Sequence, residues 1–240
     1  MYLSEAMISE SFWPRVRQSF EALPQLDEIA NQVLVASRIA HKKFPPETAG
    51  SININAIKLL WLLARYFRPR VIAEVGTFVG RSTLALAEGA GDSLGALHTC
   101  DYSFSEFSVP SEFQSNFGNV ERIVYHAKTS PTDMFKAMLT GHRGKVDCFF
   151  LDGRLGAEDL GLIQELRSPE AVFLLDDFEG VEKGASNALM LRQAFGELIL
   201  LRQEQTVTDQ GRLQISNTAL MLPAQLLSLS RQQEVSLDMC

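Results

Sequence analysis

The residues best suited to chemistry in this sequence surround a short loop that contains two glycines. The apolar run Val71–Val75 contains one acid, Glu74, and leads into the loop Gly76–Gly80, after which a helical segment begins near Ser82. Glycine lets a chain turn tightly and lets a ligand come close to the backbone. The start of a helix offers unpaired N–H groups and the positive end of the helix dipole. This stretch therefore predicts a loop that binds a carboxylate or a phosphate.

Acids also stand at the ends of other apolar runs. Asp101 follows the run after the glycine loop, and Asp152 follows a later run. Because the carboxyl ends of parallel strands meet at one edge of a sheet, we expect both side chains to lie over the same cleft as the loop. Asp101 is placed to accept hydrogen bonds from both hydroxyls of a ribose.

A parallel sheet is needed to bring these residues together, and the pattern of the chain predicts one. Short apolar runs alternate with helical segments, and the first five runs are continuous, as in parallel strands covered on both faces. This alternation predicts a doubly wound α/β fold with right-handed crossovers. The expected strands are Val71–Val75, Ala96–Cys100, Arg122–Tyr125, Val146–Leu151, Ala171–Leu175, Glu197–Leu201 and Ala219–Leu222. The expected helices are Ile54–Phe67, Ser82–Glu88, Pro131–Leu139, Glu158–Leu166 and Gly184–Phe195.

The two ends of the chain extend this pattern. The last two expected strands are joined by the polar link Arg202–Asn217, which suits an antiparallel hairpin at the edge of the sheet. Before the first strand, Phe12–Leu23 and Leu26–Phe44 show helical spacing of apolar residues, and a pair of prolines then breaks the chain. We therefore expect a helical N-terminal extension, residues 1–50, packed on one domain of residues 51–240.

Composition narrows the classes of partner. The chain of 240 residues carries a formal net charge of −7, whereas a protein that binds nucleic acid usually shows a basic surplus. No apolar run reaches the roughly eighteen residues that a membrane span needs, and the first residues do not resemble a signal peptide. The three cysteines are scattered without metal-ligand spacing, as free thiols in a reducing compartment are. We expect a cytoplasmic protein that binds neither nucleic acid nor membrane.

The stretch EVGTFVGRSTL, which begins at Glu74, resembles motif I of the class I S-adenosylmethionine-dependent methyltransferases. It is most similar to the small-molecule O-methyltransferases of the catechol and caffeoyl-CoA type, and the resemblance runs from about Ile54 to Pro223. The resemblance implies a Rossmann-like sheet of seven strands, one of them antiparallel, with S-adenosylmethionine as the cofactor. It also implies methyl transfer to a small molecule, at oxygen more often than at nitrogen.

The resemblance assigns roles to the residues around the loop. Gly76 and Gly80 would shape the cofactor loop, and Glu74 would order it from beneath. Ser82 would bind the methionine carboxylate, and Asp101 would hold the ribose hydroxyls. The remaining members of the expected cofactor site are Thr77 and Phe78 along the pocket, Lys128 and Thr129 beside the adenine, and Asp152.

The same resemblance raises the question of a metal. Some members of the family depend on a metal. If this chain resembles them, Asp152, Asp176 and Asp177 would supply oxygen ligands for Mg²⁺ or another divalent cation. The sequence departs from the family pattern here, because the strand-five pair is usually Asp-Asn and the lysine base of the catechol-type enzymes is absent. The metal and the general base therefore stay open. The candidates for catalysis are Asp152, His126 and Lys183.

Two other hypotheses remain open on the sequence. One is a protein that binds S-adenosylmethionine without catalysis, because the family lysine is missing. The other is an NAD-dependent dehydrogenase, which the G-x-x-x-G spacing disfavours because dinucleotide binders carry G-x-G-x-x-G. The N-terminal extension could also form a homodimer contact, and the aromatic segment Tyr102–Gly118 could be a lid or part of the core.

Overall fold

The chain folds around one seven-stranded sheet. The computed structural model describes residues 12–14, 16, 18, 23, 25–40, 52–102, 117–178, 183–201 and 218–229. The strands are β1 (Val71–Val75), β2 (Ala96–Asp101), β3 (Ile123–Ala127), β4 (Val146–Leu151), β5 (Arg167–Leu175), β6 (Leu198–Leu201) and β7 (Ala219–Pro223). They lie in the order β3-β2-β1-β4-β5-β7-β6, and β7 runs antiparallel to both of its neighbours. The expected Rossmann-like sheet, mostly parallel with one antiparallel strand, is confirmed.

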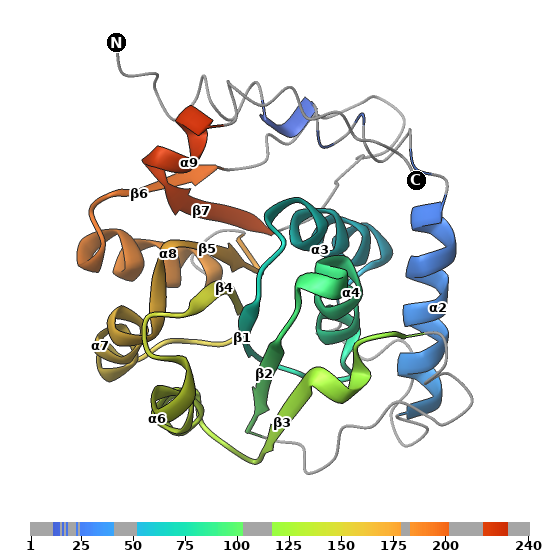
Figure 1. Cartoon of the computed structure of the whole chain (residues 1–240), viewed down its shortest axis with the longest axis horizontal. Coiled ribbons are helices and arrows are strands. Elements are labelled where there is room, and N and C mark those ends of the chain that lie inside the picture. The colour runs from blue at the N-terminus through green and yellow to red at the C-terminus, as the bar shows by residue number, and fades with distance from the viewer. Residues whose placement is uncertain are drawn as a thin grey trace.

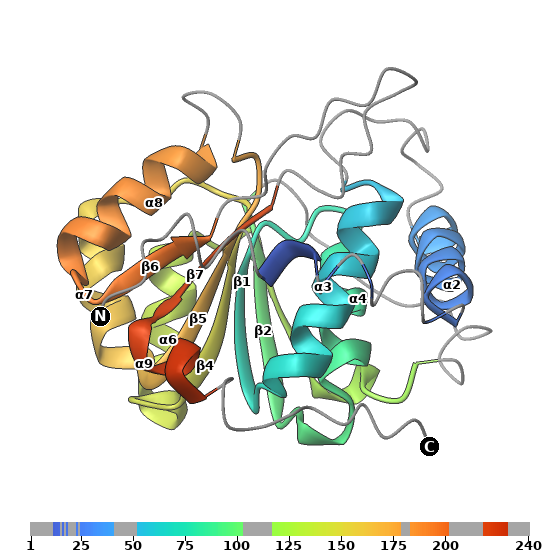
Figure 2. The same cartoon turned by 90° about the horizontal axis from the view of Figure 1, so that it is seen from above.

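Helices cover both faces of this sheet (Figure 2). On one face lie α3 (Ile54–Phe67) and α4 (Arg81–Ala90), and on the other lie α6 (Pro131–His142), α7 (Ala157–Leu166) and α8 (Lys183–Ala194). The shorter elements are η1 (Gly91–Ser93), η2 (Val120–Arg122) and α9 (Ala224–Leu229). Each face of the sheet has its own cluster of buried apolar residues. Because the central strands are covered twice, their sequences are continuous apolar runs.

The order of the strands reverses between β1 and β4. The chain passes from β1 outward to β2 and β3, whereas β4 and β5 lie on the opposite side of β1. The segments that leave the carboxyl ends of β1 and β4 therefore diverge, and ligands of open α/β sheets bind at such a point. The fold places the glycine loop and Asp152 on the two sides of this position.

Helix α2 (Gln25–Ala40) lies outside α3 and α4 and packs on both of them (Figure 1). Arg81, the first residue of α4, connects the three helices through hydrogen bonds. Its Nε donates to Ser37 Oγ of α2 at 3.3 Å, and its Nη1 donates to the carbonyl oxygen of Ile52, before α3, at 3.0 Å. Helix α2 thereby supports the helix that begins at the glycine loop. The expected division into an extension and a domain stays a prediction.

The observed elements differ from expectation mainly at their ends. β5 begins at Arg167, earlier than the expected strand Ala171–Leu175, because Arg167 already pairs with Val146 of β4. The register then shifts, and the apolar residues of the two strands pair from Cys148 and Val172 onward. The expected hairpin link, residues 202–217, and most of the aromatic segment, residues 103–116, lie outside the described residues. Within the part of the chain that is described, no helix combines the length and apolar character of a membrane span.

The close crossing of α3 and α4 depends on Gly89. A Cβ added to Gly89 would overlap the carbonyl oxygen of Trp61 and the Cβ of Ala64. We expect Gly89→Ala to lower the free energy of unfolding by about 1–3 kcal/mol, because extra atoms in a packed core force the backbone apart. Urea unfolding measures the change.

A matched glycine in another helix gives the control. Gly161 is exposed in the interior of α7, and nothing lies within 4 Å of a Cβ added there. Gly161→Ala should therefore raise the free energy of unfolding by about 0.5–1 kcal/mol, the usual gain from removing a glycine inside a helix. A Gly89→Ala protein as stable as the wild type would contradict the close crossing.

Candidate active site

The glycine loop leaves β1 through backbone hydrogen bonds to β2. The N–H groups of Gly76 and Thr77 both donate to the carbonyl oxygen of Cys100, at 3.0 and 3.2 Å. Gly76 has a φ of 99° and Gly80 a φ of 76°, both of which glycine adopts without a steric penalty. Phe78 has a φ of 44°, which is uncommon for a residue with a side chain. The loop is therefore a tight turn with left-handed residues that leads directly into α4.

Asp101, at the end of β2, holds this loop in place. The backbone N–H of Phe78 donates to Asp101 Oδ2 at 2.9 Å. The N–H of Thr129 donates to the carbonyl oxygen of Asp101 at 3.2 Å, so the segment after β3 is attached to the same residue. Lys128, just before Thr129, is exposed and has a φ of 51°. The structure thus brings Asp101, the loop and Thr129 together, as the sequence led us to expect of a cofactor site.

Glu74 is fully buried beneath the loop. Thr83 Oγ1 donates to Glu74 Oε2 at 2.6 Å, whereas Glu74 Oε1 has no hydrogen-bond partner among the described residues. Burial raises the pKa of Glu74 to about 7, although the nearby hydroxyls of Ser82, Thr83 and Thr99 favour its ionised form. A cation above the loop would stabilise the carboxylate. The positively charged methionine end of S-adenosylmethionine fits this requirement.

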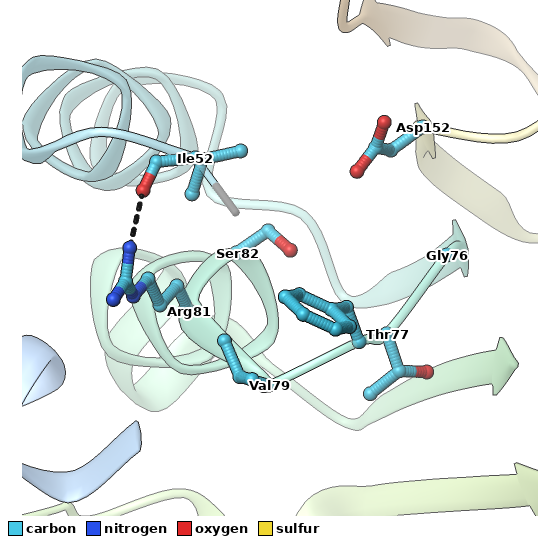
Figure 3. Close-up of a pocket in the computed structure, with 8 residues that line it drawn as sticks. Ile52, Gly76, Thr77, Val79, Arg81, Ser82 and Asp152 are labelled. Carbon is cyan, nitrogen blue, oxygen red and sulfur yellow. Dashed lines mark hydrogen bonds between the residues drawn. The ribbon is translucent and has the colours of Figure 1, made fainter. Parts of the chain in front are cut away.

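A hollow lies between the glycine loop, the start of α4 and the end of β4. Figure 3 shows the hydroxyl of Ser82 and the carboxylate of Asp152 pointing toward this space from opposite sides. A Cβ added to Gly76 would lie 3.1 Å from the carbonyl oxygen of Asp152, and the N–H of Asp152 donates to the carbonyl oxygen of Val75 at 2.9 Å. The missing side chain at Gly76 therefore lets the ends of β1 and β4 approach and form a cradle.

Lys183, the first residue of α8, pairs with two acids. Its Nζ lies 2.5 Å from Asp152 Oδ1 and 3.0 Å from Asp177 Oδ2. Although burial disfavours the charged form, the two carboxylates raise the pKa of Lys183. Burial and the Asp176 carboxylate raise the pKa of Asp152, and Lys183 opposes that rise. Asp176 is itself buried and accepts a hydrogen bond from Thr218 Oγ1 at 3.2 Å.

Two residues of α8 that sequence analysis missed determine where Lys183 lies. A Cβ added to Gly184 would overlap the backbone at the end of β5, so glycine is needed for α8 to start this close to the sheet. Asn187 is buried and fixes the loop after β4, because its Nδ2 donates to the carbonyl oxygen of Gly153 at 2.8 Å and its Oδ1 accepts from the N–H of Leu155 at 3.1 Å. Neither residue belongs to a motif that could have marked it.

His126 of β3 lies apart from this acid and lysine cluster. Its Nε2 is 3.0 Å from Nδ1 of His98, and Nε2 of His98 is 3.0 Å from Nε2 of His142 at the end of α6. Burial, together with the neighbouring His142 and His126, lowers the pKa of His98 to about 4. Strand β3 lies three strands away from β4, or about 14 Å at the usual strand spacing. The structure therefore does not bring His126 together with Asp152 and Lys183.

With Lys183 between them, the acids at the ends of β4 and β5 do not fit a divalent cation. Among the described residues, no three His, Cys, Asp or Glu side chains are grouped as metal ligands. The ammonium of Lys183 lies between Asp152 and Asp177, where an ion bound to both of them would have to lie. Because Mg²⁺ and Ca²⁺ sit about 2.0–2.6 Å from their oxygen ligands, the metal and the ammonium cannot share this position.

Solved structures with the same architecture are known. The O-methyltransferase TomG from Streptomyces achromogenes, involved in tomaymycin synthesis and solved with S-adenosylmethionine, has a TM-score of 0.58 and 22% identity, over 80% of this chain and 89% of TomG. The O-methyltransferase from Bacillus cereus, solved with S-adenosylhomocysteine, has a TM-score of 0.55 and 19% identity, over 82% and 90% of the two chains. Cofactor-bound Rv0187 from MTB has a TM-score of 0.56 and 21% identity, over 86% and 95%. No protein-family model and no curated protein matches the sequence. The fold is that of these proteins, two of which are O-methyltransferases.

The buried Glu74 should make stability depend on pH. Its pKa is about 7 in the folded protein against an ordinary value of 4.5, so between these values the folded state holds a proton that the unfolded state has lost. The free energy of unfolding should therefore fall as the pH rises through this window, by up to about 3 kcal/mol from this group. Glu74→Gln cannot ionise, and urea unfolding at a series of pH values should show it to be the more stable protein above pH 7.

An exposed glutamate separates this effect from the rest of the titration. Glu170 is exposed on β5, and Glu170→Gln should keep the pH profile of the wild type. If the profiles of the wild type and Glu74→Gln run parallel across the window, the buried carboxyl is not the group that titrates.

Proposed function

We propose that this protein is an S-adenosylmethionine-dependent methyltransferase that transfers a methyl group to an oxygen of a small molecule. The observation that carries the proposal is the hydrogen bond from the N–H of Phe78 to Asp101, which joins the glycine loop to the acid of β2 beside the strand reversal. The loop and the acid are thereby presented to one ligand. A nicotinamide dehydrogenase would use a similar sheet, but the glycine spacing of this loop disfavours it.

Each part of the cofactor has a residue of matching chemistry. The start of α4, where Ser82 points into the hollow, suits the methionine carboxylate. The buried Glu74 suits the positive charge of the methionine end, and Asp101 suits the ribose hydroxyls. Lys128 and Thr129, at the exit of β3, border the expected position of the adenine. When bound, the cofactor supplies an electrophilic methyl group, which a nucleophile attacks in line.

The acceptor side is formed by Asp152 and Lys183. These side chains lie together at the end of β4, so an acceptor hydroxyl placed there would meet both a proton acceptor and a hydrogen-bond donor. Enzymes of this kind accelerate transfer mainly by holding two reactants in line. TomG and the Bacillus cereus protein are O-methyltransferases, which supports oxygen as the accepting atom. The proposed reaction uses no divalent cation, because the ammonium of Lys183 lies between the acids that would bind one.

Other expectations from the sequence stay predictions. Cys100 and Cys148 are buried free thiols, which is in keeping with a reducing compartment such as the cytoplasm. A homodimer and the absence of a nucleic-acid partner also stay predictions from the sequence.

Calorimetric titration with S-adenosylhomocysteine tests the cofactor site. We expect micromolar binding by the wild type and a loss of at least about tenfold for Asp101→Ala, because that variant loses the ribose acceptor and the bond that holds the loop. Asp92→Ala, which removes an exposed acid in η1, should bind like the wild type. Well-folded wild type that binds NAD⁺ instead, or binds neither ligand, would contradict the proposal.

A further inference from the structure

The packing of the fold fixes the position of Lys183, which is not a flexible side chain on the surface. Its side chain is 25% exposed, and that of Asp152 is 10% exposed. The helix that carries Lys183 begins against the end of β5 because residue 184 is glycine. Asn187 of the same helix binds the loop that follows Asp152. The lysine and the two strand ends are therefore parts of one packed unit.

The acids around Lys183 favour a cation between them. Asp176 is buried next to Asp177, and the side chain of Asp152 on the neighbouring strand end is only 10% exposed, so water screens little of the repulsion between these acids. Asp176 is partly satisfied by Thr218, whereas Asp152 and Asp177 each pair with the lysine ammonium. A largely buried carboxylate such as Asp152 is unfavourable without a partner, so this position favours either a positive charge or a bound proton, and Lys183 supplies the charge.

A lysine ammonium and a divalent cation differ in what they can hold. A divalent ion binds several oxygens at once and can chelate two neighbouring oxygens of one substrate. An ammonium has three N–H donors. Two of them are accounted for by Asp152 and Asp177, which are the ion-pair partners of Lys183 among the described residues. Within the described part of the chain, one donor remains for one acceptor oxygen.

We propose that the ammonium of Lys183 takes the place of a divalent cation between Asp152 and Asp177, and that it holds the methyl acceptor through a single oxygen. The inference rests on the proposed methyltransferase function for the nature of the acceptor. It follows that the enzyme works without an added metal. Its acceptors are compounds with one hydroxyl at the reacting position, and a neighbouring second hydroxyl brings no advantage.

Binding of Mn²⁺, measured by calorimetry on the full-length protein, tests the first half of the proposal. We expect no binding by the wild type at millimolar Mn²⁺, and binding by Lys183→Met, because that variant keeps the acids and removes their cation. Lys183→Arg keeps a positive charge and should bind no Mn²⁺. Lys136→Met removes a lysine from an exposed pair with Glu158 and should also bind none. Circular dichroism confirms that each variant is folded.

The outcomes of this titration are decisive without any knowledge of the substrate. Binding of Mn²⁺ by the wild type would overturn the proposal, since the ion and the ammonium cannot share the position. Absence of binding by folded Lys183→Met would also overturn it, because the lysine would then not be filling a cation site. Both results are independent of S-adenosylhomocysteine titration, whose failure would overturn the proposed function, and with it the nature of the acceptor, but would leave the position of Lys183 between the acids untouched.

Transfer of a labelled methyl group tests the second half. Across a panel of paired acceptors, we expect each phenol to be methylated at least as fast as its catechol counterpart, with rates unchanged by EDTA. A preference of about tenfold or more for the catechols that EDTA abolishes would show chelation by a metal and contradict the proposal.

Discussion

The structure depends on the close approach of β1 and β4 at the point where the order of strands reverses. Gly76 has no side chain, and its backbone therefore lies against that of Asp152, which continues the ladder by donating to Val75. Beyond this contact the two segments diverge, one into the glycine loop and α4, the other toward α7. The hollow between them is a consequence of topology, and the side chains around it come from segments that are distant in the sequence. Any larger residue at position 76 would push the two strand ends apart.

The acids at this edge of the sheet are stabilised in different ways, and the differences indicate separate roles. Glu74 has one hydroxyl donor and a raised pKa, which leaves its charge dependent on a cationic ligand. Asp101 accepts from a backbone N–H and thereby orders the loop that the ligand meets. Asp152 and Asp177 have the ammonium of Lys183. The first two acids thus belong to the cofactor side of the hollow, whereas the lysine and its acids belong to the side where the acceptor must arrive.

The sequence predicts the parallel sheet well because burial on both faces makes its strands continuous apolar runs, and it predicts the loop because glycine spacing is a local property. It predicts poorly whatever depends on packing between distant segments. The pairing of Lys183 with Asp152 requires Gly184 and Asn187 to seat α8, and no local pattern marks those residues. His98, His126 and His142 come from three elements, and no motif marks the contacts within this histidine trio. His126 lies away from Asp152 because β3 is three strands from β4. The early start of β5 was missed because its first residues are polar.

Hydrogen exchange with and without S-adenosylhomocysteine tests most directly whether the cofactor binds at the strand reversal. Peptides that cover the glycine loop and the first turn of α4, together with the end of β2, should exchange more slowly when the ligand is present, because a ligand bound to these segments opposes the local openings that expose their N–H groups. Peptides from the exposed surface of α7 should be unchanged. Protection confined to the histidine trio or to α9, with the glycine loop unaffected, would contradict the site described above.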